Sequence, residues 1–517
     1  MSIRTLSDVK LAVGKDEKEL FMLAQKKLGR KPQYFEIKKK SLDARDKNNI
    51  RFVYTIAFSA EPQRKEQTPL ERLSGNQIPQ NAVLVVGSGP AGLFCALRLL
   101  NRGITPIVIE RGANVEEREK KISAFCETKS LDTETNVQFG EGGAGTFSDG
   151  KLNTQTHSPL NRAVLETFVR FGAPEEILWL NKPHIGSDNL KTVVRNMREY
   201  IIQCGGQVRF HTRLEDIKMS NGQLTEARLK DLAQGREETL AVSALVLAVG
   251  HSARDTFEML LARGVQMRQK EFAVGVRIEH LQSDIGFAQY GKAYTALPAA
   301  DYKLVSHASE RSVFTFCMCP GGYVMPATSE ENAVVTNGMS NFARNGINAN
   351  AALIAQVTRA DFANEHPLAG VEFQRRLEQN AFVAGGRTYA APVQLVGDFL
   401  AGRESKCFGE VLPTYGAGTA FADLRTVFPQ GVTSALQTAL RDMNGRLKGF
   451  AKADALLTGV ESRTSSPLRM ERDETLQSVS VAGLYPCGEG AGYAGGITSS
   501  AADGIRVADA VYARFLQ

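Results

Sequence analysis

The sequence lacks several features that would assign it to a specialised class of protein. No apolar run approaches the roughly 20 residues that cross a bilayer, and the charged first 20 residues contain no apolar core of a secretory signal. The seven cysteines are odd in number and scattered over 517 residues, which favours a reducing compartment over a disulfide framework. The seven histidines form no cluster with cysteines at ligand spacing. We therefore expect a cytoplasmic protein with no membrane span and no metal site.

The net charge of +6 is concentrated at one end of the chain. Residues 1–80 hold 17 Lys and Arg against 10 Asp and Glu, whereas the remainder holds 45 against 46. A basic segment is compatible with RNA, an acidic partner or a membrane surface. Because aromatic residues are not interleaved with the charges, a solvated face is the favoured interpretation. Nucleic acid stays an alternative partner.

What the sequence does contain is a glycine-rich motif in its full context. An apolar strand (83–86) runs into Gly87-x-Gly89-x-x-Gly92, a helix follows, and the next strand ends on Glu110. These glycines allow a sharp turn, close approach of a pyrophosphate and tight helix–sheet packing, while the helix start offers unpaired N–H groups. Glu110 can accept both ribose hydroxyls and would repel a 2′-phosphate. The unit predicts a site for the ADP half of a dinucleotide.

Features later in the chain favour FAD over NAD as that dinucleotide. The buried strand over 244–250 ends on Ala-Val-Gly, a partial match to the Ala-Thr-Gly of many flavoproteins. Gly488-Glu489 resembles the flavoprotein Gly-Asp motif, whose acid bonds the ribityl chain. The stretch 495–498 opens the final helix, whose positive end is expected to face the flavin. Early and late segments are thus predicted to converge on one FAD.

A second glycine-rich loop, at 140–150, matches the same spacing but lacks its context. No strong strand precedes it, and the residues after it break any helix. We interpret it as a backbone loop lying along the flavin and its pyrophosphate, with Asp149 and Lys151 near the isoalloxazine. No second convincing nucleotide motif exists. NADH or NADPH would therefore bind only transiently over the flavin, or electrons would come from another protein.

From about residue 81 to its end, the chain resembles the uncharacterised FAD-dependent dehydrogenases of the glutathione-reductase-like flavoprotein group. The segments that carry this resemblance are Phe139–Leu152, Phe316–Gly322, Arg463–Arg469 and Gly488–Asp503. The resemblance implies the fold and FAD, and it supplies no substrate. The predicted fold class is α/β: a Rossmann-like FAD-binding domain, an inserted and mostly antiparallel α+β cap domain, and a small N-terminal β-α-β-β module.

Changes in composition and in the pattern of apolar residues divide the chain into segments. The alternating apolar residues of the front module, the prolines after it and the mixed strands of the middle region mark the boundaries. The expected segments are a basic α+β module (1–60), a linker (61–80), the first part of the FAD-binding domain (81–255), the inserted cap (256–455) and the second part of the FAD-binding domain (456–517).

The expected cofactor-binding residues come from these motifs and the strands beside them. They are Gly87, Ser88, Gly89, Pro90, Ala91, Gly92, Glu110, Arg111, Gly142, Gly143, Ala144, Gly145, Thr146, Asp149, Gly150, Leu214, Ala248, Gly250, Gly488, Glu489, Gly496, Ile497 and Thr498. The candidate catalytic residues are Lys151, Arg277 and Arg463. For the two arginines and for Arg469, a salt bridge between domains is an equal alternative. His280, on the opposite strand face from Arg277, is expected to be structural.

Cys317 and Cys319 suggest a redox dithiol at first sight. Flavin disulfide reductases of this fold type carry Cys-x4-Cys beyond the acid at the end of the second strand, and here Cys126 stands alone. Residues two apart on a strand share one face, which strains a disulfide. We therefore favour packing of these two side chains over dithiol chemistry.

The leading hypothesis is an FAD-dependent oxidoreductase acting on an unidentified small-molecule substrate. Three alternatives stay open: an RNA-modifying flavoenzyme that uses the basic module, an isoprenoid or alkene reductase, and a non-enzymatic flavin-binding protein. The motifs select neither a substrate, nor an electron donor or acceptor, nor an oligomeric state, nor a role for the basic module.

Overall fold

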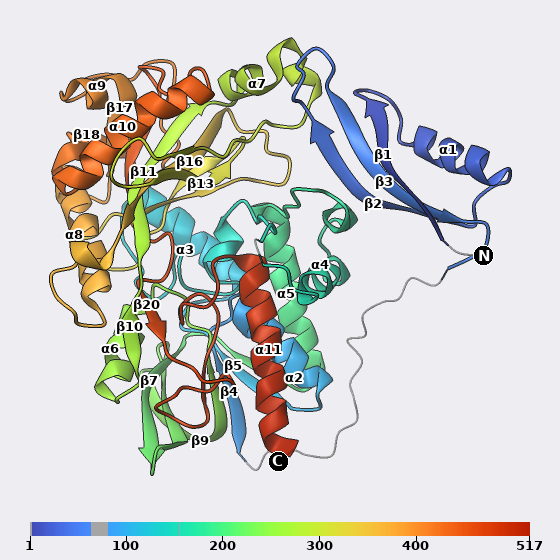
Figure 1. Ribbon diagram of the computed structural model, residues 1–517. Coiled ribbons are helices and arrows are strands. Elements are labelled where there is room, and N and C mark those ends of the chain that lie inside the picture. The colour runs from blue at the N-terminus through green and yellow to red at the C-terminus, as the bar shows by residue number, and fades with distance from the viewer. Residues whose placement is uncertain (1–2, 64–80, 155, 517) are drawn as a thin grey trace.

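A computed structural model describes residues 3–63, 81–154 and 156–516, and shows a Rossmann-like domain, an antiparallel cap and a small N-terminal module (Figure 1). The expected fold class is confirmed. Most of the expected linker, 64–80, lies outside the described residues. Within the described parts of the chain, no helix combines the length and apolar character needed to cross a bilayer.

The N-terminal module has the expected β-α-β-β order. Its elements are β1 (Arg4–Ala12), α1 (Lys18–Leu28), β2 (Tyr34–Asp43) and β3 (Arg51–Ser59). The antiparallel sheet has the order β1-β3-β2, and Leu20 and Ala24 of α1 pack on Tyr54, Ile56 and Phe58 of β3. The alternation that predicted β3 arises because one face of that strand covers this small core.

The Rossmann-like domain is built on a sheet with the order β6-β5-β4-β9-β8-β7, and β21 pairs with β9. Strands β4, β5, β6, β9 and β21 pair in parallel, and β7, β8 and β9 form an antiparallel extension. The central strands are continuous apolar runs because helices cover the sheet. The strands are β4 (Ala82–Val86), β5 (Pro106–Ile109), β6 (Gln207–Arg209), β7 (Thr212–Ser220), β8 (Gln223–Asp231), β9 (Arg236–Leu247) and β21 (Leu484–Pro486).

Helices α2 and α11 pack against each other beside this sheet, although one opens the domain and the other closes the chain (Figure 1). A Cβ on Gly504 would lie 2.1 Å from the carbonyl oxygen of Ala91, so the two helices are in direct backbone contact. The helices of this domain are α2 (Pro90–Asn101), α3 (Val115–Thr128), α4 (Leu160–Arg170), α5 (Ser187–Gln203), α6 (Arg254–Ala262) and α11 (Ile497–Leu516).

The cap is centred on a sheet with the order β12-β13-β16-β11-β19-β17-β18, antiparallel except between β17 and β18. Its strands are β11 (Phe272–Leu281), β12 (Val305–Ser306), β13 (Val313–Cys319), β16 (Asn348–Val357), β17 (Ala391–Leu395), β18 (Thr419–Phe421) and β19 (Leu456–Glu461). Helices α8 (Ala369–Ala384) and α10 (Gln430–Arg446) contribute to its apolar core. Because β19 pairs with β11 and β17, the expected boundary at 455/456 cuts the cap sheet and lies too early.

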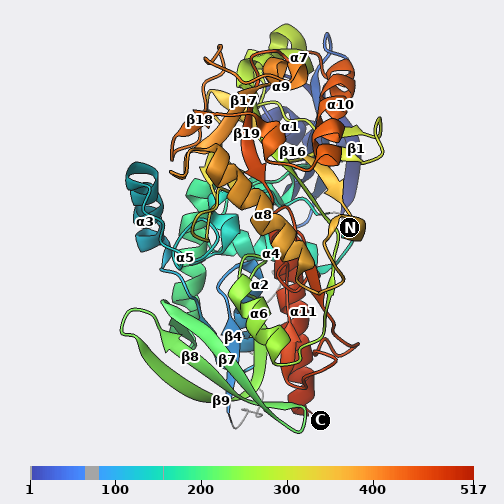
Figure 2. The same cartoon turned by 90° about the vertical axis from the view of Figure 1, so that its left-hand side faces the viewer.

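Shorter elements connect these bodies. In Figure 2, α8 runs from the cap towards α6 of the Rossmann-like domain. The remaining elements are β10 (Met267–Gln269), α7 (Gln282–Tyr290), β14 (Tyr323–Pro326), β15 (Thr336–Met339), α9 (Val396–Ala401) and β20 (Leu468–Met470), of which β10 and β20 pair with each other. The N-terminal module contacts α7 and residues 179–181: Lys47 Nζ donates to the carbonyl of Ala288, and Lys40 N–H donates to that of Trp179.

Candidate functional site

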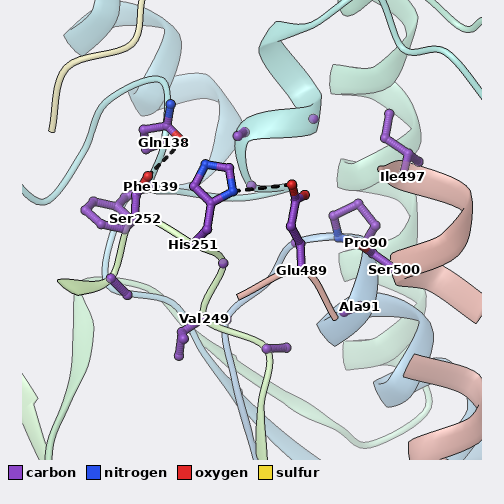
Figure 3. A pocket seen from close by; sticks show the side chains of 18 of the residues that line it. Pro90, Ala91, Gln138, Phe139, Val249, His251, Ser252, Glu489, Ile497 and Ser500 are labelled. Carbon is purple, nitrogen blue, oxygen red and sulfur yellow. Dashed lines mark hydrogen bonds and ion pairs between the residues drawn. The ribbon is translucent and has the colours of Figure 1, made fainter. Parts of the chain in front are cut away.

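A cavity of about 340 Å³ lies between the Rossmann-like domain and the cap. Its walls come from the carboxyl ends of β4, β5 and β9, the loop at 143–151, the start of α11 and the cap strands. Figure 3 shows side chains from several of these segments directed into it. In open α/β sheets, the carboxyl ends of the strands are where ligands bind.

The glycines of the first motif have two different roles. A Cβ on Gly87 would lie 2.3 Å from the carbonyl oxygen of Ala248, and one on Gly92 would lie 1.9 Å from that of Gly87. Both glycines are therefore required for backbone packing. A Cβ on Gly89 would meet nothing closer than the Cα of Gly143, at 3.8 Å, and Gly89 lines the cavity. No other part of the protein fills the space beside Gly89, and a ligand in the cavity would need that space to approach the backbone.

The start of α2 faces this cavity. Gly89 is the N-cap of α2, and among the described residues no side chain caps the helix there. The first N–H groups of a helix have no partner within the helix and carry partial positive charge. Pro90 and Ala91 line the cavity (Figure 3). This end is therefore an anion-binding position of the type that holds a pyrophosphate.

The second glycine-rich loop packs directly against the first turn. The N–H of Gly142 donates to the carbonyl of Ser88 over 3.0 Å. A short 3-10 turn at 144–147 follows. The sequence context predicted that no α-helix would begin directly after this loop, and none does in the described residues. Gly143, Ala144 and Gly145 line the cavity.

Arg118 of α3 holds that loop in place. Its side chain is fully buried and donates hydrogen bonds to main-chain carbonyls of the loop. The acceptors are Asn136, Val137, Gly140, Glu141 and Gly143. Burial lowers the pKa of Arg118 to about 10, although Glu110 and Glu141 act in the opposite direction. The guanidinium stays charged at neutral pH and ties the loop to α3.

Glu110 is bonded mainly to the protein itself. Its carboxylate accepts from the N–H groups of Ser88, Gly112 and Gly140, each at 3.0 Å, and from the Ser88 hydroxyl at 2.8 Å. A carboxylate has about four acceptor positions, so the chain occupies them all. Glu110 therefore joins the turn to the loop, and a ribose hydroxyl would have to share an oxygen with one of these donors.

The tail of the chain returns to the same cavity. The N–H of Gly488 donates to Asp503 over 2.8 Å, and Asp503 pairs with Arg472 at 2.8 Å. Burial alone raises the pKa of Asp503, and the Arg472 hydrogen bond and charge lower it by more. Glu489 points into the cavity, where its Oε1 lies 3.3 Å from Nδ1 of His251 (Figure 3).

The structure brings most of the expected cofactor-binding residues to the cavity wall. Those lining it are Gly87, Gly89, Pro90, Ala91, Glu110, Arg111, Gly143, Ala144, Gly145, Asp149, Gly150, Leu214, Ala248, Gly250, Glu489, Gly496 and Ile497. Six others lie behind the wall because they pack backbone segments together: Ser88, Gly92, Gly142, Thr146, Gly488 and Thr498. The Thr498 hydroxyl, for example, donates to the carbonyl of Leu152 over 2.8 Å.

The candidate catalytic residues lie at the cap end, and they are not equivalent. Lys151 lines the cavity, with Nζ 3.1 Å from Oδ2 of Asp149. Burial alone lowers the pKa of Lys151, but its electrostatic interactions with Cys319, Asp149 and Cys317 raise it by more. Lys151 is therefore a positive group at neutral pH.

The two candidate arginines are held in ion pairs, which favours the salt-bridge alternative. Arg277 is fully buried behind the cavity wall, with Nε 2.8 Å from Glu461. Arg277 therefore does not line the cavity, because strand β11 directs it at Glu461. Arg463 lines the cavity, but Glu378 accepts from its Nη2 at 2.8 Å and from its Nε at 3.0 Å. Arg469 donates to the carbonyl of Gly492.

Glu378 also joins the cap to the Rossmann-like domain. It accepts from Arg254 of α6 at 2.8 Å as well as from Arg463. All three side chains are buried. Burial alone raises the pKa of Glu378, and the two guanidinium groups drive it far below its ordinary value.

Several residues of the cavity wall were not expected from the sequence. Gln138 and Phe139 precede the second glycine loop, and His251 and Ser252 follow Gly250, so their positions beside motifs were an available signal. The Ser252 hydroxyl donates to Oε1 of Gln138 over 3.1 Å (Figure 3). Among the cap residues on the wall, Phe316, Cys317 and Thr464 lie in segments that carry the family resemblance, whereas Asn337 and Glu461 had no such signal.

Metal ligands do not gather in the described part of the chain. Across residues 3–63, 81–154 and 156–516, no three or more His, Cys, Asp or Glu side chains are placed to hold a metal ion.

Comparisons with protein families match three ranges of the chain. Residues 81–283 match "pyridine nucleotide-disulphide oxidoreductase", and residues 271–464 match "FAD-dependent protein, C-terminal domain-like". Residues 3–59 match a domain of unknown function.

Two curated relatives were found. An uncharacterised protein of Clostridium beijerinckii is 45% identical over 501 residues, covering 93% of this chain and 92% of that protein. Aklavinone 12-hydroxylase of Streptomyces peucetius is 28% identical over 185 residues, covering 33% and 36%.

Two of the solved structures that were matched have low identity to this chain. A geranylgeranyl bacteriochlorophyll reductase-like protein from Thermoplasma acidophilum is 11% identical, with a TM-score of 0.37, covering 84% of this chain and 79% of that one. Glycerol-3-phosphate dehydrogenase from Bacillus halodurans, complexed with FAD, is 12% identical, with a TM-score of 0.36, covering 84% and 64%.

Proposed function

Because this chain belongs to the FAD-dependent pyridine nucleotide-disulphide oxidoreductase family, we propose that it is an FAD-dependent oxidoreductase acting on a small molecule in the cavity. The observation that carries the proposal is the convergence of three distant backbone segments on one uncapped helix end. These segments are 87–91, 143–151 and 495–497. An anionic, extended dinucleotide fits such a wall, since main-chain N–H groups and glycines line it.

The residues present fit FAD. The start of α2 and the loop at 143–145 would hold the pyrophosphate. The segment 250–253 and the start of α11 would hold the flavin, near the cap. Bound there, FAD supplies hydride and electron transfer, and the protein's share is to bind, orient and tune.

The cap end determines what reaches the reacting position. Lys151 presents a positive group to the cavity, which favours an anionic substrate group over a cationic one. The Arg463 charge is balanced by Glu378, so Arg463 mainly shapes the wall and offers directed N–H donors. Phe316 lines the same end and covers part of it with apolar surface, which excludes water.

The electron donor is proposed to be NADH or NADPH, binding transiently over the flavin. In the described chain, the first motif is the strand–turn–helix unit at which such a nucleotide would dock, and FAD would already occupy it. All seven cysteines are free thiols, which supports a reducing compartment such as the cytoplasm. Anaerobic mixing of the FAD-loaded protein with each nucleotide, followed by flavin absorbance, identifies the donor.

Replacing Gly89 by alanine tests the proposed cofactor. The added Cβ has ordinary van der Waals room, and the φ of −72° at Gly89 suits any residue. The apoprotein should therefore fold normally, while the methyl group occupies the position of the pyrophosphate. We expect wild-type protein to show the visible absorbance of bound FAD and Gly89→Ala to bind FAD at least about tenfold more weakly, or about 1.4 kcal/mol.

The matched control is Gly445→Ala on α10, which lies away from the cavity and where an added Cβ meets nothing within 4 Å. Gly445→Ala should bind FAD like the wild type. Wild-type protein that cannot take up FAD, or equal affinity in Gly89→Ala, would overturn the proposal. Circular dichroism of both variants shows that the fold is retained.

A further inference from the structure

Two cysteines at the end of strand β13 are arranged one behind the other at the cap end of the cavity. Cys317 lines the cavity beside Phe316. Cys319 is fully buried and does not reach the wall. A pair of thiols in which one meets the cavity and the other stands behind it is the order needed for an attacking and a resolving sulfur.

The backbone brings these two sulfurs together. In a regular strand, residues two apart are separated by about 6.6 Å and lie side by side, near the upper limit for a disulfide. Here the pairing of β13 with β16 is irregular between Phe316 and Cys319, and Cys317 has a φ of +40°. The strand is therefore bent at Cys317. Cys319 Sγ donates to the carbonyl of Cys317 over 3.2 Å, and the two thiols are close enough for each to shift the pKa of the other.

The charges around the pair stabilise one thiolate. The hydrogen bond from Cys319 lowers the pKa of Cys317, burial raises it, and the positive charges of Lys151 and Arg277 lower it further. Asp149 acts in the opposite direction, and the net shift is downward. The hydrogen bond to Cys317 and burial both raise the pKa of Cys319. The pair thus holds one negative charge at Cys317 and one proton at Cys319.

Two main-chain contacts keep the cations in position. Arg277 Nη1 donates to the carbonyl of Cys317 over 2.9 Å, and Lys151 Nζ donates to that of Met318. Other charged groups line the same cavity, among them Glu461, which pairs with Arg277 at 2.8 Å. Since Lys151 and Arg277 act on the sulfur from outside the pair, they are positioning residues.

We propose that Cys317 and Cys319 form a dithiol site on the cap that reduces small disulfides by thiol–disulfide exchange. The inference rests on the proposed function, because reduced flavin in the same cavity is the two-electron donor that would restore the dithiol. The site is separate from the helix after Glu110, where α3 carries Cys126 without a second cysteine.

The exchange is balanced with the disulfide R–S–S–R as oxidant. The Cys317 thiolate attacks one substrate sulfur, breaks the S–S bond and releases RS⁻. Cys319 gives its proton to that thiolate, forming RSH, and its own thiolate attacks Cys317 Sγ. The Cys317–Cys319 disulfide forms and the second RS⁻ leaves. The two cysteine sulfurs lose two electrons, and the substrate disulfide gains them.

Peptide mapping after one exchange tests the site in the full-length, FAD-loaded protein. The reduced protein is mixed with 2-hydroxyethyl disulfide, quenched with acid and digested with trypsin. Cleavage after Arg311 and Arg344 gives a peptide, 312–344, that contains only these two cysteines. We expect this peptide to carry an internal disulfide in the wild type, and Cys319→Ser to trap the mixed disulfide on Cys317.

The rate of Cys317 alkylation by iodoacetamide provides a second readout. At pH 6.5, Cys317 should react at least fivefold faster than exposed Cys407, because its thiolate persists below the ordinary pKa of about 8.5. Lys151→Met and Cys319→Ala should each slow that reaction at least threefold. The control is Lys182→Met, because the ammonium group of Lys182 pairs with Asp301 outside the cavity. This variant should leave the alkylation rate of Cys317 unchanged.

Failure of this inference and failure of the proposed function give different results. If the wild-type peptide forms no internal disulfide and Cys317 reacts no faster than Cys407, the dithiol site is overturned, whether or not FAD binds. Cys317→Ser should keep the FAD absorbance while losing the exchange. Gly89→Ala should bind FAD more weakly while retaining the first exchange, since Cys317 and Cys319 are unchanged.

Discussion

The two ends of the cavity are built in different ways. At the glycine end, main-chain atoms of the segments 87–91 and 143–145 form the wall. At the cap end, side chains such as Lys151, Cys317 and Arg463 form it. Backbone walls bind a group that many proteins share, whereas side-chain walls distinguish one substrate from another. The difference explains why the cofactor can be inferred from motifs and the substrate cannot.

The two ends also differ in how their charges are stabilised. Near the cap end, Glu378 is fully buried between Arg254 and Arg463. At the glycine end, Arg111 pairs with Asp255, whose side chain is 49% exposed. Removing the charge of a buried carboxylate that two guanidinium groups share lowers the stability of the fold far more than removing the charge of an exposed carboxylate. Variants at these positions measure how strong the contrast is.

The largest effect is expected from Glu378→Gln. The change removes the buried carboxylate that two guanidinium groups share and leaves Glu330 as their remaining acidic neighbour, which should lower the free energy of unfolding by about 3–5 kcal/mol. Urea denaturation followed by circular dichroism measures it. The matched control is Glu372→Gln on the same helix, where a 64% exposed side chain pairs with Arg375 and about 0–1 kcal/mol is expected. Equal losses in both variants would remove the contrast between buried and exposed pairs.

A pH-dependent loss of stability is expected at His280, inside the cap. Burial lowers the pKa of His280 from 6.5 to about 4. Between these values the unfolded chain binds the proton and the folded chain does not, so stability rises with pH through this window and is complete above it. The difference amounts to about 3 kcal/mol. Urea titrations from pH 4.5 to 7 should show this slope in the wild type and in His157→Gln, and a smaller slope in His280→Gln. An unchanged slope in His280→Gln would contradict the assignment.

At the glycine end, Gly92→Ala should destabilise the apoprotein where Gly89→Ala does not. The new Cβ in Gly92→Ala would lie 1.9 Å from the carbonyl oxygen of Gly87, and that backbone cannot move without disturbing the turn. We expect a loss of about 1–3 kcal/mol. Denaturation of both apoproteins in urea separates packing from ligand contact. Two equally stable variants would show that the turn accommodates side chains more freely than its geometry indicates.

The smallest effect is expected from Asp255→Asn at the rim of the glycine end. Arg111 Nη1 and Nη2 each lie 2.9 Å from its carboxylate, yet water reaches the pair. The loss should not exceed about 1 kcal/mol and should shrink as salt is raised. Unfolding measured at low and high ionic strength checks both statements. A loss of stability above about 2 kcal/mol that does not depend on salt would show that the Arg111–Asp255 pair behaves like the buried pairs of Glu378.

Much of the fold follows from local pattern. The alternation over residues 51–59 predicts β3, and the apolar run at 83–86 with its glycines predicts the β4–α2 unit. These signals are reliable because the pattern records which face of an element is buried. The boundary at 455/456 was wrong because β19 joins the cap by pairing with β11, and strand pairing between distant segments leaves no local signal.

The residues of the site also fall into those that the sequence predicted and those that it did not. Gly89 and Glu489 were placed on the wall from motif position alone. Six motif residues, Thr498 among them, lie behind the wall, because a motif identifies a segment and not the direction of each group in it. The irregular strand at Cys317 could not be inferred either, since a regular strand was the only geometry its sequence suggested.

The sequence by itself determined where the backbone turns, which helix end stays uncapped and which segments form β3, β4 and α2. Those properties depend on residues close together in the chain, chiefly glycine conformations and apolar periodicity. Only the tertiary structure decided that Glu378 bridges two domains and that Arg277 faces Glu461. The same holds for the bent strand that places Cys317 at the cavity and Cys319 behind it. The reason is physical: burial and the partners of a charge depend on atoms hundreds of residues away, and folding alone brings them together.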